Sequence, residues 1–203
     1  MRSIIYTQRV EVIQNYDERR DCADQNIPKF LYTCGFSPVS IMNDPTIALQ
    51  VCKEIVPKGI FFSGGNDLYG YGGNAPERDE TEKLLLEYAV ANKIPLLGIC
   101  RGMQFIAHYY GCKLKPVENH VKKDHSIHGK IERNVVNSFH CMGVLQLTDP
   151  LIAVGCSKDG VVEALQHKSE AIAGIMWHPE RVEGFDRDDI AMVKKFYEKG
   201  SLI

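Results

Sequence analysis

The sequence predicts an α/β fold with a mostly parallel central sheet and a small antiparallel extension. Up to about residue 112, short apolar runs alternate with amphipathic stretches, a pattern typical of a parallel sheet covered by helices on both faces. After residue 112, strand-like runs follow one another with turn residues between them, which indicates antiparallel pairing. The length of 203 residues, without a repeat or linker, predicts a single domain over residues 1–203.

The first half of the chain supplies the predicted parallel strands and their helices. A first strand is expected over residues 3–7, and a helix over residues 17–35 that ends at Gly35 and is bent or interrupted by Pro28. The elements expected next are a strand at 37–42, a helix at 46–55, a buried strand at 59–65, a helix at 78–93, a buried strand at 94–99 and a helix at 101–111.

The second half is predicted to be mostly strands. A final helix over residues 186–200 begins at the capping residue Asp186 and ends at Gly200. The strand-like segments before it are 129–136, 143–148, 151–157, 161–167 and 171–177.

Composition excludes several classes of protein. A net charge of −2 gives no electrostatic basis for binding nucleic acid or an acidic membrane surface. No apolar run is long enough to span a membrane, and the N-terminus lacks the apolar core of a signal peptide. Seven cysteines without a C-x-x-C pair fit reduced thiols in the cytoplasm better than disulfides or a zinc site.

The segment Gly98-Ile99-Cys100-Arg101-Gly102 has the form G-x-C-x-G and lies between a predicted buried strand and a predicted helix. This is the pattern of a nucleophile elbow, a sharp turn that exposes its central residue. Glycines are needed where backbones approach closely, and the dipole of the following helix favours a thiolate. Cys100 is therefore the candidate nucleophile, and the backbone N–H of Arg101 is a candidate oxyanion donor.

A thiol nucleophile needs a base, and the segment "MWHPER" supplies one. Pro179 disfavours a helical His178, so the histidine is expected in extended backbone at the end of a strand. Glu180 can reach back to the imidazole and fix its tautomer. Taken alone, this segment is as well explained by an ordinary His-Pro turn, but its occurrence with Cys100 favours a catalytic triad.

A second oxyanion donor is expected at Gly64 and Gly65, at the end of a buried strand. Ligands bind beyond the carboxyl ends of parallel strands, the same edge where Cys100 is predicted. By itself the Gly-Gly pair is better explained as an ordinary strand-to-loop turn.

These motifs together resemble the class I (triad) glutamine amidotransferase domains and, within them, the free-standing γ-glutamyl hydrolases. The resemblance covers almost the whole chain and rests on the Gly-Gly turn, the elbow "GICRGMQ", "VNSFH" and "MWHPER", all in the family's order. It implies a flavodoxin-like three-layer sandwich. It also implies hydrolysis of a γ-glutamyl amide through a glutamyl thioester, without a cofactor.

The resemblance also assigns roles by position. Cys100 is the nucleophile, His178 the general acid and base, and Glu180 its orienting partner. Gly65 and Arg101 are implied as the oxyanion donors. The residues implied to hold the substrate are Gly64, Asn66, Gln104, Ser138, Phe139 and His140.

Arg101 separates two subgroups of this family. Subunits that pass ammonia to a synthase commonly have leucine after the cysteine, whereas "CRGMQ" looks like the hydrolases. We therefore expect no obligate synthase partner. A homodimer is compatible with the sequence, although no residue argues for it. Three alternatives remain: a γ-glutamyl-γ-aminobutyrate-type hydrolase, a glutaminase subunit of a separate synthase, and a non-catalytic domain on the same fold.

The N-terminal segment resembles short bacterial members of the family that accompany surface-polysaccharide biosynthesis. That resemblance implies a γ-glutamyl group on a cytidine-diphosphate phosphoramidate as the substrate. Arg19 and Arg20 are candidate phosphate ligands, although either one alone is better explained as part of a solvated helix face. In the glycine- and tyrosine-rich loop over residues 64–79, Tyr69 or Tyr71 could stack on a base, or the loop is only a connection.

We predict no metal site. His120, His125 and His128 have no standard zinc spacing, and no cysteine or carboxylate is expected to complete a site, so we interpret them as a polar loop. The glycines of residues 64–79 match no phosphate-binding loop.

Overall fold

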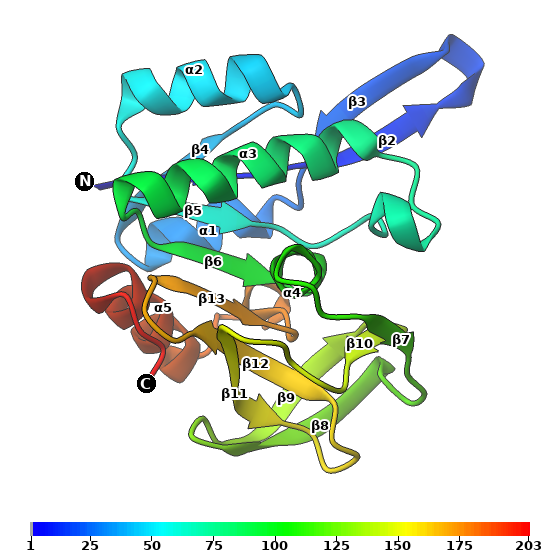
Figure 1. The fold of residues 1–203 in the computed structure, drawn as a ribbon, viewed down its shortest axis with the longest axis vertical. Helices are drawn as coiled ribbons and strands as arrows, with labels where there is room; N and C mark the ends of the chain where they lie inside the picture. The colour runs from blue at the N-terminus through cyan, green and yellow to red at the C-terminus, as the bar shows by residue number, and fades with distance from the viewer. Residues whose placement is uncertain (1) are drawn as a thin grey trace.

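The computed structural model describes residues 2–203, and its sheet begins with five parallel strands in the order β4–β1–β5–β6–β13 (Figure 1). Strands β5, β6 and β13 are short, apolar and fully buried, as expected of strands covered on both faces. Their bounds are β1 (Arg2–Tyr6), β4 (Phe36–Ser40), β5 (Gly59–Phe62), β6 (Leu96–Ile99) and β13 (Ile172–Ile175).

The antiparallel extension continues the same sheet. Strand β12 pairs antiparallel with β13, and the order then runs β12–β11–β8–β9, with β10 joined to β12 and β7. The predicted α/β fold with an antiparallel extension is therefore confirmed. The bounds are β7 (Leu114–Pro116), β8 (Val121–Gly129), β9 (Arg133–Phe139), β10 (Met142–Val144), β11 (Leu151–Cys156) and β12 (Val162–His167).

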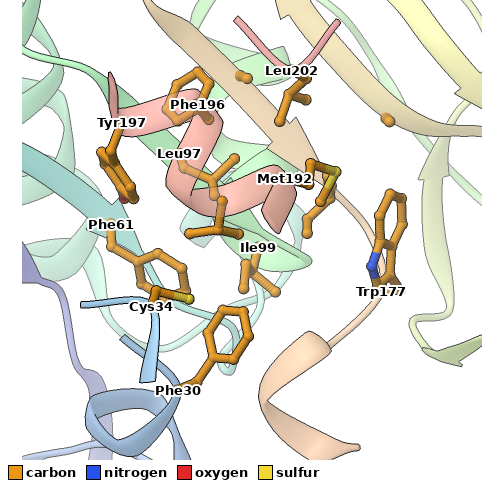
Figure 2. Close-up of a cluster of buried hydrophobic side chains, with 14 of the residues drawn as sticks. Phe30, Cys34, Phe61, Leu97, Ile99, Trp177, Met192, Phe196, Tyr197 and Leu202 are labelled. Carbon is orange, nitrogen blue, oxygen red and sulfur yellow. The ribbon is translucent and has the colours of Figure 1, made fainter. Parts of the chain in front are cut away.

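Helices cover both faces of the parallel strands and create two cores. Successive residues of a strand point to opposite faces, so Ile4 packs with α1 and α5 whereas Ile5 packs with α2, α3 and α4. Figure 2 shows the first core, to which Phe30 of α1, Phe196 of α5 and Phe61 of β5 all belong. The helices are α1 (Asn26–Thr33), α2 (Pro45–Ile55), α3 (Pro76–Asn92), α4 (Arg101–Tyr109) and α5 (Arg187–Lys199). The short 3-10 turns are η1 (Gln14–Tyr16), η2 (Tyr69–Tyr71) and η3 (Pro179–Arg181).

The prediction of a helix over residues 17–35 is wrong for its first part. Strand β2 (Arg9–Ile13) and strand β3 (Glu18–Cys22) form a separate two-stranded hairpin that extends from the body of the protein (Figure 1). The hairpin is mostly solvent-exposed, so its sequence lacks the apolar alternation that marks a half-buried strand. The helix begins later, and Pro28 lies in its first turn, where a missing N–H costs nothing.

Two strand boundaries in the extension also differ from the prediction. The segment 129–136 is the turn between β8 and β9 plus the first half of β9, because the chain reverses after Gly129. The segment 143–148 is extended only as far as Val144. No helix in residues 2–203 combines the length and apolar character needed to cross a membrane.

The strand order determines where chemistry can occur. Strands β5, β6 and β13 are parallel neighbours, so the residues that follow them meet at one edge of the sheet. These residues are the Gly64–Gly65 turn, Cys100 and His178, in that order along the chain.

Candidate active site

Cys100 occupies a strained backbone conformation between β6 and α4, with φ +50° and ψ −106°. A non-glycine residue in such a region is maintained by the surrounding structure and often marks a functional site. Its N–H donates to the carbonyl of Ile175 at 2.8 Å, and its carbonyl accepts from the N–H of Gln104 at 2.9 Å. The elbow is thus fixed on one side to β13 and on the other to the first turn of α4.

The two glycines of the elbow are required by close packing. A Cβ on Gly98 would lie 2.4 Å from the backbone of Gly102, and a Cβ on Gly102 would lie 2.3 Å from the carbonyl oxygen of Phe62. Because the nearest atoms belong to the backbone, a change of side-chain rotamer cannot relieve either contact. The close packing expected at the two glycines is therefore present in the structure.

His178 is placed by its contact with Glu180. Its Nδ1 lies 2.7 Å from Oε1 of Glu180, and both side chains are buried. Because Nδ1 faces a carboxylate, it carries a proton, and Nε2 is left for the reaction with Cys100. Burial lowers the pKa of His178, but the neighbouring Cys100 and Glu180 outweigh burial and raise it to about 9. At neutral pH His178 is therefore an imidazolium that can stabilise a thiolate at Cys100.

Asn137 holds the backbone of His178 and was missed by the sequence analysis. Its amide oxygen accepts from the His178 N–H at 2.8 Å, and its amide nitrogen donates to the His178 carbonyl at 2.8 Å. Asn137 belongs to β9, so this clasp joins the antiparallel extension to the catalytic histidine. The signal was present, since Asn137 is the first polar residue of the "VNSFH" segment.

A buried arginine orients the Gly64–Gly65 turn. Arg78 of α3 is fully buried and donates to the carbonyl oxygens of Ser63 at 2.7 Å, Gly64 at 3.2 Å and Gly65. In a trans peptide the C=O and the next N–H point in opposite directions. Because the Gly64 carbonyl faces Arg78, the N–H of Gly65 faces away from Arg78.

Arg78 is part of a charge network that spans both sides of the oxyanion site. Glu82 accepts from Arg78 at 3.1 Å and also pairs with the Arg101 side chain, which in turn pairs with Asp79. Burial is the main reason that the pKa of Arg78 falls to about 10, with the neighbouring Arg101 adding to the effect and Glu82 opposing it. Two arginines and two carboxylates balance in charge, as buried ions must.

The Arg101 side chain therefore has a structural role. It is 1% exposed, points into the network with α3 and leaves only its backbone at the site. The residue that distinguishes two subgroups in the family resemblance thus has a place in the packing of this fold. It ties the nucleophile elbow to the helix that positions the Gly64–Gly65 turn.

The triad opens into a cavity of about 290 Å³. Gln104 lies on its wall and donates to the carbonyl of Met142 at 2.8 Å, while Phe139 packs edge-on against His178 at 5.7 Å between ring centroids. A larger cavity of about 480 Å³ lies beside Trp177 and contains no triad residue. The predicted site residues that line the catalytic cavity are Gly65, Asn66, Cys100, Arg101, Gln104, Phe139, His140 and His178.

Some predicted substrate ligands have other partners. Ser138 is buried outside the cavity lining, and its hydroxyl donates to the His120 carbonyl at 2.6 Å. Asn66 uses its side-chain amide to clasp the backbone of Val10 at 2.8 and 2.9 Å. A Cβ on Gly64 would lie 2.9 Å from His178, so Gly64 makes room for the imidazole.

The candidate phosphate ligands lie outside the cavity. Arg19 and Arg20 are on β3 rather than at the start of a helix, and they pair with Glu77 and Glu18, respectively. The expected helix position was wrong because residues 18–22 form a strand. Arg9, on the other strand of the hairpin, contacts the Gly65 backbone region instead and borders a small cleft next to the catalytic cavity.

The two candidate stacking tyrosines differ in availability. The Tyr71 hydroxyl accepts from the Leu114 N–H at 3.1 Å, and its ring packs edge-on against His108. Tyr69 is 60% exposed in η2. Neither ring lines the catalytic cavity.

The histidines expected in a polar loop are in or beside β8. His120 and His125 lie together, whereas His128 is exposed and contacts Ser126. The sequence expectation that no carboxylate accompanies them is wrong, because Glu163 of β12 lies between their rings and His140.

Relatives of known name match between 70% and 94% of the chain. It is 37% identical over 196 residues to the γ-glutamyl-CDP-amidate hydrolase of Campylobacter jejuni, which covers 94% of this chain and 95% of that protein. It is 32% identical over 152 residues to one subunit of the glutamine-hydrolysing GMP synthase of Methanococcus vannielii, which covers 70% and 75%, respectively.

Solved structures agree on the fold. A putative GMP synthase subunit from Thermoplasma acidophilum superimposes with a TM-score of 0.71 at 20% identity, covering 98% of this chain and 94% of that one. A glutamine amidotransferase from Thermotoga maritima gives a TM-score of 0.66 at 16% identity, covering 97% and 83%.

The profile of the class-I glutamine amidotransferases matches residues 18–199, a span that contains the elbow cysteine, the histidine and the glutamate described above. These residues make the chain an enzyme that hydrolyses an amide through a cysteine nucleophile. This protein belongs to the class-I glutamine amidotransferase family.

Proposed function

We propose that this chain is a free-standing hydrolase that converts γ-glutamyl-CDP-amidate and water into glutamate and CDP-amidate. The observation that carries the reaction type is Cys100 on its strained elbow beside the His178–Glu180 pair. The substrate is supported by the similarity to the Campylobacter hydrolase, which extends over 94% of the chain.

The first half of the reaction forms a thioester. The Cys100 thiolate attacks the γ-carbonyl carbon, and the carbonyl electron pair moves to the oxygen, where the N–H groups of Gly65 and Arg101 stabilise it. As the tetrahedral intermediate collapses, the C–N bond breaks and the leaving nitrogen takes the proton from Nε2 of His178. CDP-amidate leaves with its P–N bond intact.

The second half releases glutamate. Neutral His178 removes a proton from water, and the resulting hydroxide attacks the thioester carbonyl carbon. The C–S bond breaks, the thiolate of Cys100 is regenerated, and His178 again carries a proton. Glu180 keeps the imidazole in one tautomer throughout.

The leaving group carries two phosphorus centres, and two arginines flank the site. Arg181 lies on the cavity wall with its guanidinium 4.7 Å from the centre of the Phe139 ring, and Arg9 lies across the Gly64–Gly65 turn. Both side chains are partly exposed, at 34% and 45%. We therefore assign phosphate binding to this pair rather than to Arg19 and Arg20.

We infer further that residues 1–203 act as one domain and need no separate synthase. All seven cysteines are free, which suits the reducing cytoplasm. The sequence similarity to a GMP synthase subunit keeps the alternative of a glutaminase that serves a partner enzyme.

The test is glutamate release by the isolated chain from γ-glutamyl-CDP-amidate, γ-glutamyl-γ-aminobutyrate and glutamine. We expect rapid turnover of the nucleotide substrate alone, abolished in Cys100→Ala. Preference for γ-glutamyl-γ-aminobutyrate would overturn the leaving group while keeping the mechanism. Turnover of glutamine only after a synthase is added would establish the alternative.

The arginine assignment has its own matched control. Replacing Arg9 or Arg181 by alanine removes a charge-assisted hydrogen bond worth about 1.5–3 kcal/mol, so KM for the nucleotide substrate should rise about 10-fold to 100-fold. KM for the nucleotide substrate should stay unchanged in the control Arg20→Ala, whose guanidinium pairs with Glu18. An equal rise in KM for Arg20→Ala, or no rise for Arg9→Ala and Arg181→Ala, would contradict the assignment.

A further inference from the structure

A cluster of histidines around one carboxylate lies in the antiparallel extension, beside the catalytic cavity. Oε1 of Glu163 is 3.2 Å from Nδ1 of His120, 3.4 Å from Nε2 of His125 and 3.4 Å from Nε2 of His140. The exposed fractions of His120, His140 and Glu163 are 3%, 3% and 1%. His120 precedes β8, His125 lies within it, His140 follows β9 and Glu163 belongs to β12, so the fold gathers them from distant parts of the chain.

The contacts within the cluster are not hydrogen bonds. Each of the three facing nitrogens, and the Glu163 oxygen itself, is buried without a hydrogen-bond partner although the distances are short. Their directions do not point at one another, as N–H groups and an acceptor would. Four buried polar atoms without partners are costly unless another group satisfies them.

The outer partners of two histidines determine which nitrogen carries the proton. Nδ1 of His140 lies 3.0 Å from the Met142 carbonyl, and Nε2 of His120 lies 3.0 Å from the carboxylate of Asp159. Both acceptors require a proton on those nitrogens. In the neutral rings, lone pairs then face Glu163, where they oppose the lone pairs of its oxygen. A cation among them removes this repulsion.

From this geometry we propose that His120, His125, His140 and Glu163 bind a Zn²⁺ ion that has a structural role. Zinc bonds of about 2.0–2.1 Å at tetrahedral angles place neighbouring ligand atoms about 3.3–3.4 Å apart, which matches the three separations from Glu163. One donor atom from each of His120, His125 and Glu163 also lies within 4.8 Å of the others. His140 is 3.4 Å from the same Glu163 oxygen but lies outside this group, so its ring has to move closer to the other histidines to complete the site. Three imidazoles suit zinc, and four protein ligands leave no position for a substrate.

The second contacts of the ligands agree with this assignment. Histidines that bind a metal usually donate their other N–H to a carboxylate or a backbone carbonyl, as His120 and His140 do here. The site differs from the expectation drawn from sequence spacing. That expectation considered only the neighbouring histidines, whereas the carboxylate comes from β12.

The ion would join parts of the sheet that are weakly paired. Strands β8 and β11 share only two residue pairs, so little backbone pairing connects the β8–β9 hairpin to β12. His140 is followed by Cys141 and Met142, and all three line the catalytic cavity. Binding at this site would therefore hold one wall of the substrate pocket.

The experiment measures metal content in the Cys100→Ala background, so that the catalytic thiol cannot bind zinc. We expect about one Zn²⁺ per chain by elemental analysis after dialysis. Replacement with Co²⁺ should give the strong visible absorption of a tetrahedral site. His125→Ala and Glu163→Gln should lose both signals, and the control His128→Ala should keep them.

A variant outside the cluster protects the test against misfolding. Asp159→Asn changes a half-exposed side chain, so its circular dichroism should match the parent protein, while its zinc affinity should fall about 10-fold to 100-fold. A parent chain that binds neither Zn²⁺ nor Co²⁺ would overturn the proposal. So would zinc binding that is unaffected by Asp159→Asn, His125→Ala and Glu163→Gln. None of these measurements depends on the substrate proposed above.

Discussion

Replacing Arg78 by methionine tests whether this buried arginine positions the oxyanion turn. The change removes the guanidinium but keeps a long apolar side chain of similar reach. The carbonyl oxygens of Ser63, Gly64 and Gly65 lose their shared donor, and Glu82 loses one of its two arginines. Both the stability of the fold and the position of the Gly65 N–H should suffer.

The size of the effect follows from burial. Removing one partner of a buried ion pair costs about 3–5 kcal/mol. The carbonyl oxygens that lose Arg78 lie at the edge of the cavity and can bind water instead, so we add no further cost for them. For a chain of this size, 1 kcal/mol shifts Tm by about 2–4 °C, so Tm should fall by about 6–20 °C. Loss of one oxyanion donor lowers kcat by about 10²–10³.

The assay is steady-state glutamate release below the Tm of the variant, together with calorimetry. Arg19→Met is the matched control, because its exposed pair with Glu77 is worth about 0–1 kcal/mol. A folded Arg78→Met protein with the parental kcat would refute the idea that Arg78 orients the turn.

Three further outcomes follow from the site. Because the pKa of His178 is raised to about 9, the imidazole stays protonated at neutral pH, and kcat/KM should fall as pH rises through about 9. Glu180→Gln removes one cause of the raised pKa, so the fall in kcat/KM should begin at lower pH. A pH profile identical to that of the parent would contradict this reasoning. Asn137→Ala loses two hydrogen bonds to His178, so urea unfolding should show a loss of about 1–3 kcal/mol and kcat should drop; unchanged kcat would mean that the clasp is not needed. Gly102→Ala places a Cβ 2.3 Å from a carbonyl of β5, so its Tm should fall by the equivalent of at least about 1–3 kcal/mol, whereas Gly70→Ala, in open space, should match the parent.

The triad could be predicted because its constraints are local. The glycines on either side of Cys100 and the proline after His178 restrict the backbone within a few residues, and sequence order along parallel strands brings the pieces to one edge. The parallel strands were also predictable, since burial on both faces leaves continuous apolar runs.

The supporting residues could not be predicted because their contacts join distant segments. In the sequence, Arg78 is indistinguishable from a charged residue on a polar helix face. In the structure it is fully buried and donates to the carbonyl of Ser63, 15 residues earlier in the chain. Glu163 reads as a strand residue with no visible link to His120, 43 positions earlier. The β2–β3 hairpin could not be predicted for another reason. An exposed strand has no apolar face, so its sequence has no alternation of apolar and polar residues.

The hairpin has a consequence for how this enzyme can be altered. Strands β2 and β3 pair only with each other, and polar clasps from Asn66 to Val10 and from Asn43 to Asp21 fasten the hairpin to the body. Adding or deleting residue pairs at its tip therefore changes no register in the central sheet. The length of the hairpin can therefore be varied by design while the nucleophile and its histidine stay where they are.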